Sequence, residues 1–217
     1  MLTLPEQLLL LALHDQKGTI LTSASMSIEY GLAGAVIMEL ALLEKVEVRN
    51  KKLVLVERSY TGDAILDQAI TLLRDSARER DVAYWINRFN SKMKIKPAVL
   101  QRLVKQGILK YEEHKILGLF DSPHYPTRNP EEEKQIREQI RRLVLRRDAA
   151  ETRTPLLMGL VKACGLTNEI FTREERKEAK QRIKEIMAGD QIAKAVADTV
   201  TGIEAALVTV IIAGGSS

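Results

Sequence analysis

Residues 28–43, which read IEYGLAGAVIMELALL, form the strongest apolar helical segment of the 217-residue chain. Its apolar residues recur three or four positions apart, the spacing of one helix face: Ile28, Leu32, Val36, Leu40 and Leu43. Two glycines interrupt the segment, Gly31 and Gly34, and each costs about 1 kcal/mol relative to alanine inside a helix. The pattern therefore predicts a helix that another part of the backbone approaches closely.

The composition of the chain indicates a globular, mainly helical protein. Hydrophobic residues make up 45% of the chain and charged residues 29%, which excludes a disordered or collagen-like polypeptide. Only 4% of the residues are aromatic, so we expect a core of aliphatic side chains on helices rather than an aromatic-rich β-sandwich. The single cysteine, Cys164, excludes an internal disulfide and a multi-cysteine metal site, and we expect it to be a small core residue.

The segment from Ile192 to Ala213 is the one stretch whose hydrophobicity suggests a membrane span. It carries Lys194, Asp198 and Glu204, and charged side chains are costly at the centre of a bilayer. Its apolar residues form one helical stripe: Ile192, Val196, Val200, Ile203, Leu207 and Ile211. We therefore expect a buried helix here.

Because the first residues lack a basic segment, we also expect no secretory signal and a cytoplasmic protein.

The order of the segments predicts a single domain over residues 1–217. Capping boxes at Thr3 and Thr172 start two of the helices. Hairpins are expected at residues 46–56 and 108–120, the second with Glu112 to His114 at its tip. A helix pair thus precedes a hairpin twice, over residues 3–57 and about 80–120, which is the order of a winged-helix unit. The predicted fold class is mainly α: one compact helical domain around a buried C-terminal helix, with two small β-hairpins.

No group of residues has the spacing of a catalytic, metal or cofactor site. The three histidines, His14, His114 and His124, fall in predicted turns or loops without a metal-ligand partner at helical spacing. Glu39 is an acid inside an apolar run, so we expect an arginine or a backbone donor to meet it in a structural ion pair. The sequence therefore predicts neither catalysis nor a cofactor.

Basic side chains are the more informative feature, because five lie close together in sequence and can hold a phosphate: Lys92, Lys94, Lys96, Arg102 and Lys105. The second predicted hairpin follows them, and four of its residues are the candidate membrane contacts: Tyr111, Ile116, Leu117 and Leu119. Cations beside an apolar hairpin suit an anionic membrane surface. The alternative is a solvated lysine-rich loop and a hairpin packed against the protein's own core.

Several short motifs follow one another in a recognisable order along most of the chain: Leu8–Gly18, Gly31–Gly34, Glu39–Leu42, Thr61–Asp63 with Leu66, Asp67 and Ala69, Trp85–Ile86, Val104–Leu109 and Leu119–Asp121. In this order they resemble the Golgi phosphoprotein 3 family. The resemblance implies a mostly helical domain and a peripheral membrane protein without catalytic activity. It also implies anionic lipid and the tails of membrane proteins as partners, since eukaryotic relatives retain glycosyltransferases through such tails.

The resemblance further implies a lipid site. Eukaryotic relatives bind phosphatidylinositol 4-phosphate in a basic pocket beside an apolar hairpin that enters the Golgi membrane. One pocket arginine of the relatives matches Lys96, and another falls near Lys92 to Lys94. Their pocket tryptophan and a third arginine correspond to Ala24 and Ala33, and lysine lacks the two-pronged phosphate geometry of arginine. The resemblance therefore implies the class of lipid more than the particular head group.

A winged-helix DNA-binding regulator is the alternative function. The repeated helix–helix–hairpin order and the basic tip Arg49–Lys52 favour it. The net charge of only +4, and the absence of base-reading side chains at Ala33, Ala35 and Val36, make a nucleic acid a poor partner. Small residues of the same helix suit internal packing or a subunit contact equally well, so the sequence leaves a homo-oligomer open.

Overall fold

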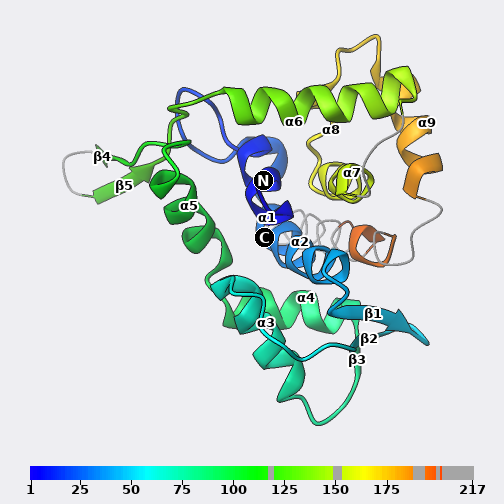
Figure 1. Cartoon of the computed structure of the whole chain (residues 1–217). Helices are drawn as coiled ribbons and strands as arrows, with labels where there is room; N and C mark the ends of the chain where they lie inside the picture. The colour runs from blue at the N-terminus through cyan, green and yellow to red at the C-terminus, as the bar shows by residue number, and fades with distance from the viewer. Residues whose placement is uncertain (117–119, 149–152, 188–193, 199–200, 202–217) are drawn as a thin grey trace, which may run out of the picture.

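The structure is a computed structural model that describes residues 1–116, 120–148, 153–187, 194–198 and 201. It is mainly helical, with two small antiparallel sheets at the edges of the helical body (Figure 1). The helices are α1 (Leu4–Leu11), α2 (Ile28–Leu42), α3 (Ala64–Arg74), α4 (Val82–Lys92), α5 (Ile95–Lys105), α6 (Glu131–Arg141), α7 (Arg153–Ala163), α8 (Thr167–Ile170) and α9 (Arg176–Met187), with a short 3₁₀ helix η1 (Thr22–Ala24) and a short π-helix η2 (Arg142–Arg146). The mainly α fold class is confirmed.

Helix α2 lies at the centre of the described chain. Every residue from Gly31 to Leu40 is buried, and α2 contacts α1, α3, α4, α5 and α7 (Figure 1). A helix that is apolar on all sides is stable only when other elements surround it. The segment predicted from its apolar face is therefore the central helix of the described core.

Local signals in the sequence start the helices. Thr3 and Glu6 form the predicted capping box, because the Thr3 amide donates to Glu6 Oε2 at 2.7 Å. Asp63 caps α3 by accepting from the amides of Ile65 and Leu66. The Thr172 amide likewise donates to Glu175 Oε2 at 2.9 Å ahead of α9. These boundaries follow from side chains within a few residues of each helix start.

The two glycines of α2 do permit a close approach, but by side chains rather than by backbone. A Cβ on Gly31 would overlap the Sγ atom of Cys164, the residue directly after α7. A Cβ on Gly34 would overlap Val196 Cγ1. Cys164 is fully buried, as expected for a small core residue. The glycines therefore accommodate neighbouring side chains at helix–helix contacts.

Replacing Gly31 with alanine should destabilise the protein by about 1–3 kcal/mol, because the added methyl overpacks a filled contact. In a Cys164→Ala background the overlap disappears, and Gly31→Ala should then be neutral or stabilise by up to about 1 kcal/mol through helix propensity. Urea denaturation of the four proteins measures this coupling. An equal effect of Gly31→Ala in both backgrounds would contradict the contact.

The first sheet has three strands rather than the predicted two. Strands β1 (Val46–Arg49) and β2 (Lys52–Leu55) form the expected hairpin, whose turn residues Asn50 and Lys51 both have positive φ, as a two-residue turn requires. Strand β3 (Arg80–Asp81) pairs with β2, with Leu53 opposite Arg80. A two-residue strand in a charged stretch carries no alternation of apolar and polar residues, so the sequence pattern did not indicate it.

The second hairpin exists, but its predicted boundaries are wrong. Its strands are β4 (Glu112–Ile116) and β5 (Phe120–His124), so the residues expected at the tip lie in β4, and two of the three histidines lie in strands. Ile108 and Leu109, assigned to the first strand by their hydrophobicity, are buried core residues that follow α5. Pro123 lies in β5, which has a free edge where a missing amide hydrogen is tolerated.

The predicted C-terminal helix falls largely outside the described residues. Residues 194–198 are helical, and within them Val196 and Ala197 are buried while Lys194 and Asp198 are exposed. Of the predicted stripe, Ile192, Val200, Ile203, Leu207 and Ile211 lie outside the described residues. Within the described ranges, no helix is both long enough and apolar enough to cross a bilayer.

Candidate functional site: the lysine row of α5 and the β4–β5 hairpin

Three of the five predicted cations lie at the two ends of α5 and at the end of α4, the helix before it. Lys92 ends α4, Lys94 precedes the first turn of α5, and Lys105 ends α5. All three side chains are exposed, and none of them forms an ion pair with a described residue. With a rise of about 1.5 Å per residue, Lys94 and Lys105 are about 16 Å apart along the helix axis. The cations therefore form a row and not a pocket.

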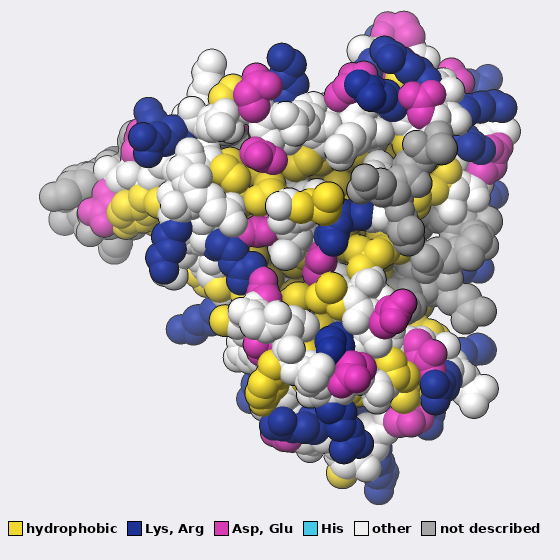
Figure 2. Space-filling view, in the orientation of Figure 1, with side chains coloured by type: hydrophobic (Ala, Val, Ile, Leu, Met, Phe, Trp, Pro, Cys, Tyr) yellow, Lys and Arg dark blue, Asp and Glu magenta, His cyan; other side chains and the backbone are white. Residues whose placement is uncertain are grey.

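Lys94 and Lys105 are eleven residues apart, close to three full helical turns, so they lie on one face of α5 with exposed Gln101 between them. Lys and Arg side chains follow this edge of the molecule below the projecting hairpin (Figure 2). We define Lys92, Lys94 and Lys105 as the lysine row.

Two of the five predicted cations are instead held by acids of the fold. Lys96 pairs with Glu29 in the first turn of α2, and its side chain is one-third exposed. Arg102 donates two hydrogen bonds to Asp63, from Nη1 to Oδ2 at 2.5 Å and from Nη2 to Oδ1 at 3.0 Å. These two charges are neutralised within the protein, so they contribute less than the lysine row to attraction of an outside anion.

The Arg102–Asp63 pair joins α5 to the start of α3. Burial opposes ionisation of Asp63, but the hydrogen bonds from Arg102 and from the amides of Leu66 and Ile65 outweigh it, so the pKa of Asp63 is lowered. Arg102 Nε also lies 3.9 Å from Glu6 Oε1 of the α1 capping box. Arg102 therefore links three helix ends.

A cation that the sequence reading did not single out lies next to the row. Arg88 is exposed and precedes Lys92 by four residues on α4, so the two side chains are neighbours on one helix face. It forms no ion pair with a described residue. The i, i+4 spacing of Arg88 and Lys92 is the signal that could have identified it.

The hairpin projects from the body beyond the Lys105 end of α5 (Figure 1). Of its predicted membrane contacts, Tyr111 is half-exposed at the base, where its ring lies 5.6 Å from that of Tyr125 and its hydroxyl donates to Glu113 at 2.6 Å. Ile116 is the last residue of β4, opposite Phe120. Leu117 and Leu119 lie outside the described residues. The contacts of the hairpin with a membrane therefore stay a prediction.

The turn at residues 14–18 anchors the base of the hairpin. The Tyr125 amide donates to the Gly18 carbonyl at 2.9 Å, and the Thr127 amide donates to the Asp15 carbonyl at 2.8 Å. Gly18 has a positive φ of 61°, and a Cβ there would overlap the backbone of Tyr125 and Pro126. The turn therefore fixes the direction in which the strand leaves the body.

Ala24 and Ala33, the positions at which the resemblance implies that a tryptophan and an arginine of a lipid pocket are replaced, are both fully buried. Neither methyl group can contact a phosphate. Both positions therefore contribute to core packing.

Glu39 and His14 have structural partners. Glu39 is 3% exposed and accepts from the Leu4 amide at 2.7 Å and from both terminal nitrogens of Arg153, at 2.5 and 2.9 Å, so the predicted ion pair is confirmed. The His14 ring accepts from the amides of Gln16 and Lys17 within its own turn. No cluster of metal-ligating side chains occurs among the described residues.

The winged-helix order is present in α1, α2 and the β1–β2 hairpin, but α2 cannot serve as a recognition helix. Its residues from Gly31 to Leu40 are buried, whereas a recognition helix must present side chains to the major groove. The burial of α2 removes the main argument for the DNA-binding alternative.

A family model and two curated proteins are similar to this chain. A family model described as Golgi phosphoprotein 3 (GPP34) matches residues 4–203. A "Vacuolar protein sorting-associated protein 74" from Eremothecium gossypii is 28% identical over 161 residues, which cover 64% of this chain and 48% of that protein. A protein of the same name from Schizosaccharomyces pombe is 34% identical over 147 residues, 58% of this chain and 43% of its own. The chain spans about half the length of the curated relatives it matches.

Proposed function

The chain belongs to the Golgi phosphoprotein 3 (GPP34) family, and on that basis we propose that it is a non-catalytic adaptor that docks on anionic membrane surfaces. The docking surface consists of the lysine row and the β4–β5 hairpin. Anionic phospholipid head groups are the ligand, and the tails of membrane proteins are the cargo. Such a protein works on the cytoplasmic side of a membrane as a peripheral component.

The observation that carries this proposal is the lysine row itself. Lys92, Lys94 and Lys105 are exposed and without ion pairs among the described residues, and they lie at the end of α4 and at the two ends of α5, the helix that precedes the hairpin. A lysine near an anionic leaflet contributes about 1 kcal/mol of attraction, and an apolar hairpin adds partitioning into the interface. Charge and shape thus favour a membrane over a compact soluble ligand.

The particular lipid follows from the same geometry. Because the row extends over about 16 Å and contains lysines, it meets several head groups at once instead of enclosing one. Lys96 is paired with Glu29, and Ala24 and Ala33 are buried, so the elements of a fitted phosphoinositide pocket are incomplete. We therefore propose that binding depends on the anionic charge of the membrane more than on phosphatidylinositol 4-phosphate itself.

Vesicle co-sedimentation tests this proposal. The Lys94→Ala/Lys105→Ala variant should bind vesicles that contain phosphatidylserine about 30-fold more weakly, because two lysines contribute roughly 2 kcal/mol. Binding by the unaltered protein should weaken with rising salt and with a falling anionic fraction. Vesicles with phosphatidylinositol 4-phosphate at equal total charge should bind similarly.

The matched control is Lys177→Ala/Lys180→Ala, which removes two exposed lysines of α9. It should leave vesicle binding unchanged. Equal losses in both double variants, or binding that ignores the anionic fraction, would overturn the proposed docking surface. A strong preference for phosphatidylinositol 4-phosphate at constant charge would overturn the charge-based selectivity.

A further inference from the structure

The stretch of chain that carries the predicted cations contains no acid of its own. Helices α4 and α5 have neither aspartate nor glutamate, and the same holds for the whole sequence between Asp81 and Glu112. An acid that pairs with a cation of this stretch must therefore come from another element. For Lys96 that acid is Glu29, which lies in the first turn of α2.

Lys96 belongs to the same corner of the fold as two members of the lysine row. The corner between α4 and α5 is anchored in the core by Met93 and Ile95, which are 5% and 4% exposed and alternate with Lys92, Lys94 and Lys96. Met93 has an extended backbone, in which successive side chains point to opposite sides, so its burial directs the neighbouring lysines outward. Four residues span at most about 14 Å, so three unpaired lysine side chains at this corner could reach one anion.

Glu29 supplies this corner with an anion from within the protein. Its carboxylate pairs with Nζ of Lys96, and α2 packs against α5. The dipole of α2 favours a negative charge in the first turn of the helix, so α2 itself stabilises the ionised carboxylate. Both side chains are partly exposed, and ion pairs at such positions are weak, so removing the acid frees the lysine at little cost. Glu29 belongs to none of the motifs on which the family resemblance rests.

We propose that Glu29 determines the head-group selectivity of the docking surface, because it competes with lipid phosphate for Lys96. This inference rests on the proposed function. With Glu29 in place, Lys92 and Lys94 are the free cations of the corner, and they respond to the charge of the membrane without holding one particular head group.

Without the carboxylate, Lys96 becomes a third donor at the same corner. Three ammonium groups suit a phosphate monoester, whose terminal oxygens accept several charge-assisted hydrogen bonds. The phosphodiester of phosphatidylserine offers one fewer terminal oxygen and a smaller charge. Removal of Glu29 should therefore convert a surface that recognises charge into one that prefers a phosphate monoester.

Vesicle co-sedimentation tests this role with phosphatidic acid, a phosphate monoester, and phosphatidylserine, in vesicles of equal surface potential. The unaltered protein should bind both kinds of vesicle similarly. Glu29→Gln should bind the phosphatidic acid vesicles roughly fivefold more tightly than the phosphatidylserine vesicles, since the added contact is to the phosphate itself. In Glu29→Gln/Lys96→Ala the preference should disappear, because the released lysine is absent.

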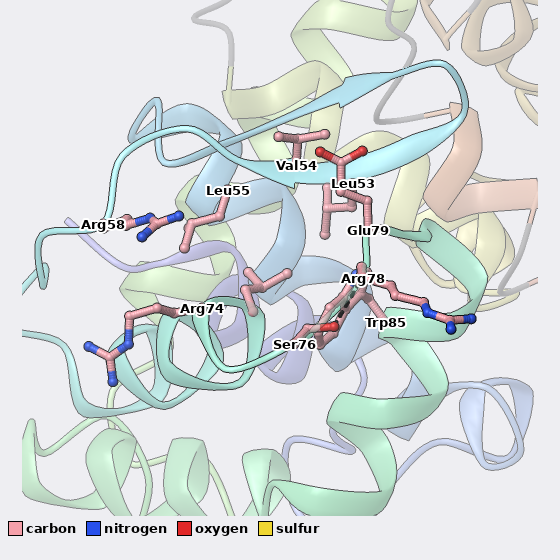
Figure 3. A pocket seen from close by; sticks show the side chains of 10 residues that line it. Leu53, Val54, Leu55, Arg58, Arg74, Ser76, Arg78, Glu79 and Trp85 are labelled. Atoms are coloured by element: carbon pink, nitrogen blue, oxygen red, sulfur yellow. Dashed lines mark hydrogen bonds between the residues drawn. The ribbon is translucent and has the colours of Figure 1, made fainter.

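Glu79→Gln is the matched control, because Glu79 is also an exposed acid close to cations. It lines a cavity between β2 and the loop from α3 to β3, together with Arg58, Arg74 and Arg78 (Figure 3). This cavity shares no residue with the lysine row. Glu79→Gln therefore makes the same change of charge away from the docking surface, and it should alter neither the affinity nor the preference.

Equal affinities of Glu29→Gln for the two kinds of vesicle, or a preference that persists in Glu29→Gln/Lys96→Ala, would refute the role of Glu29. Because Glu29 is partly exposed, the variant should stay folded by circular dichroism, and Glu29→Ala should show the same preference. The outcome is separable from the proposed docking surface. If Lys94→Ala/Lys105→Ala weakens binding while Glu29→Gln shows no preference, the docking surface stands and the selectivity does not depend on Glu29.

Discussion

Replacing Arg153 with alanine is expected to reduce the free energy of unfolding by about 3–5 kcal/mol, the largest effect of any single substitution proposed for this chain. Glu39 is 3% exposed, and among the described residues Arg153 is the one cation that contacts it, with nitrogen–oxygen distances of 2.5 and 2.9 Å. Removing the arginine leaves a buried carboxylate without its counterion. Of the donors in the described part of the chain, the Leu4 amide then remains, at 2.7 Å.

The Glu39→Gln substitution provides the matched test. A glutamine can still accept from the Leu4 amide but carries no charge, so Arg153→Ala/Glu39→Gln should recover much of the stability lost in Arg153→Ala. Urea denaturation of the four proteins gives the coupling energy of the pair. A loss below about 1 kcal/mol in Arg153→Ala, or no recovery in the double variant, would show that water replaces the arginine.

The Glu39–Arg153 ion pair also shows which part of the structure the sequence alone could predict. An acid inside the apolar run of α2 indicates a buried charge that needs a partner, and this much of the prediction was confirmed. The identity of the partner depends on tertiary packing, since Arg153 lies 114 residues away at the start of α7. Local patterns fix where a helix begins and which side is buried, but not which helix ends meet.

Tertiary packing also explains why three of the five predicted cations, and not all five, remain candidates for the site. The sequence shows five positive charges near residue 100, and it cannot show that Arg102 meets Asp63 or that Lys96 meets Glu29. Both acids precede their partners by tens of residues and belong to other helices. The lysine row consists of the three predicted cations that form no such pair with a described residue.

The boundaries predicted for the second hairpin are wrong because an apolar residue can belong to the core as well as to a strand. Ile108 and Leu109 are apolar because they complete the core below α5, and not because they begin a strand. The real strands contain Glu112, Glu113 and Pro123, residues that are common in exposed edge strands and that strand patterns undervalue. Exposed strands with a functional role are the elements that patterns of burial identify least well.

A buried acid beside the hairpin's anchor should make the stability of the protein depend on pH. Glu133, in the first turn of α6, is 5% exposed. Burial raises its pKa from 4.5 to about 7; Arg137 opposes the rise, and the nearby carboxyl of Asp15 adds to it. Asp15 belongs to the turn that holds Thr127 at the base of the hairpin. The charge state of Glu133 therefore acts on the turn that positions the hairpin.

The sign follows from proton binding. Between pH 4.5 and about 7 the folded protein holds a proton on Glu133 that the unfolded chain has already released. Stability from this group is therefore fully present below pH 4.5 and is lost as pH rises through this range. The pKa difference corresponds to roughly 3 kcal/mol once pH exceeds the folded value. This is the second large effect expected for the chain.

Glu133→Gln should remove this dependence, because glutamine resembles the protonated acid at every pH. Urea denaturation at pH 5 and pH 8 should give the variant a stability similar to that of the unaltered protein at pH 5 and up to about 3 kcal/mol greater at pH 8. Glu132→Gln, one residue earlier in the same turn of α6, controls for the loss of a negative charge near the helix start. If the unaltered protein and Glu133→Gln change in parallel between the two pH values, Glu133 is ionised throughout, and its bond with Arg137, at 2.7 Å, outweighs the cost of burial.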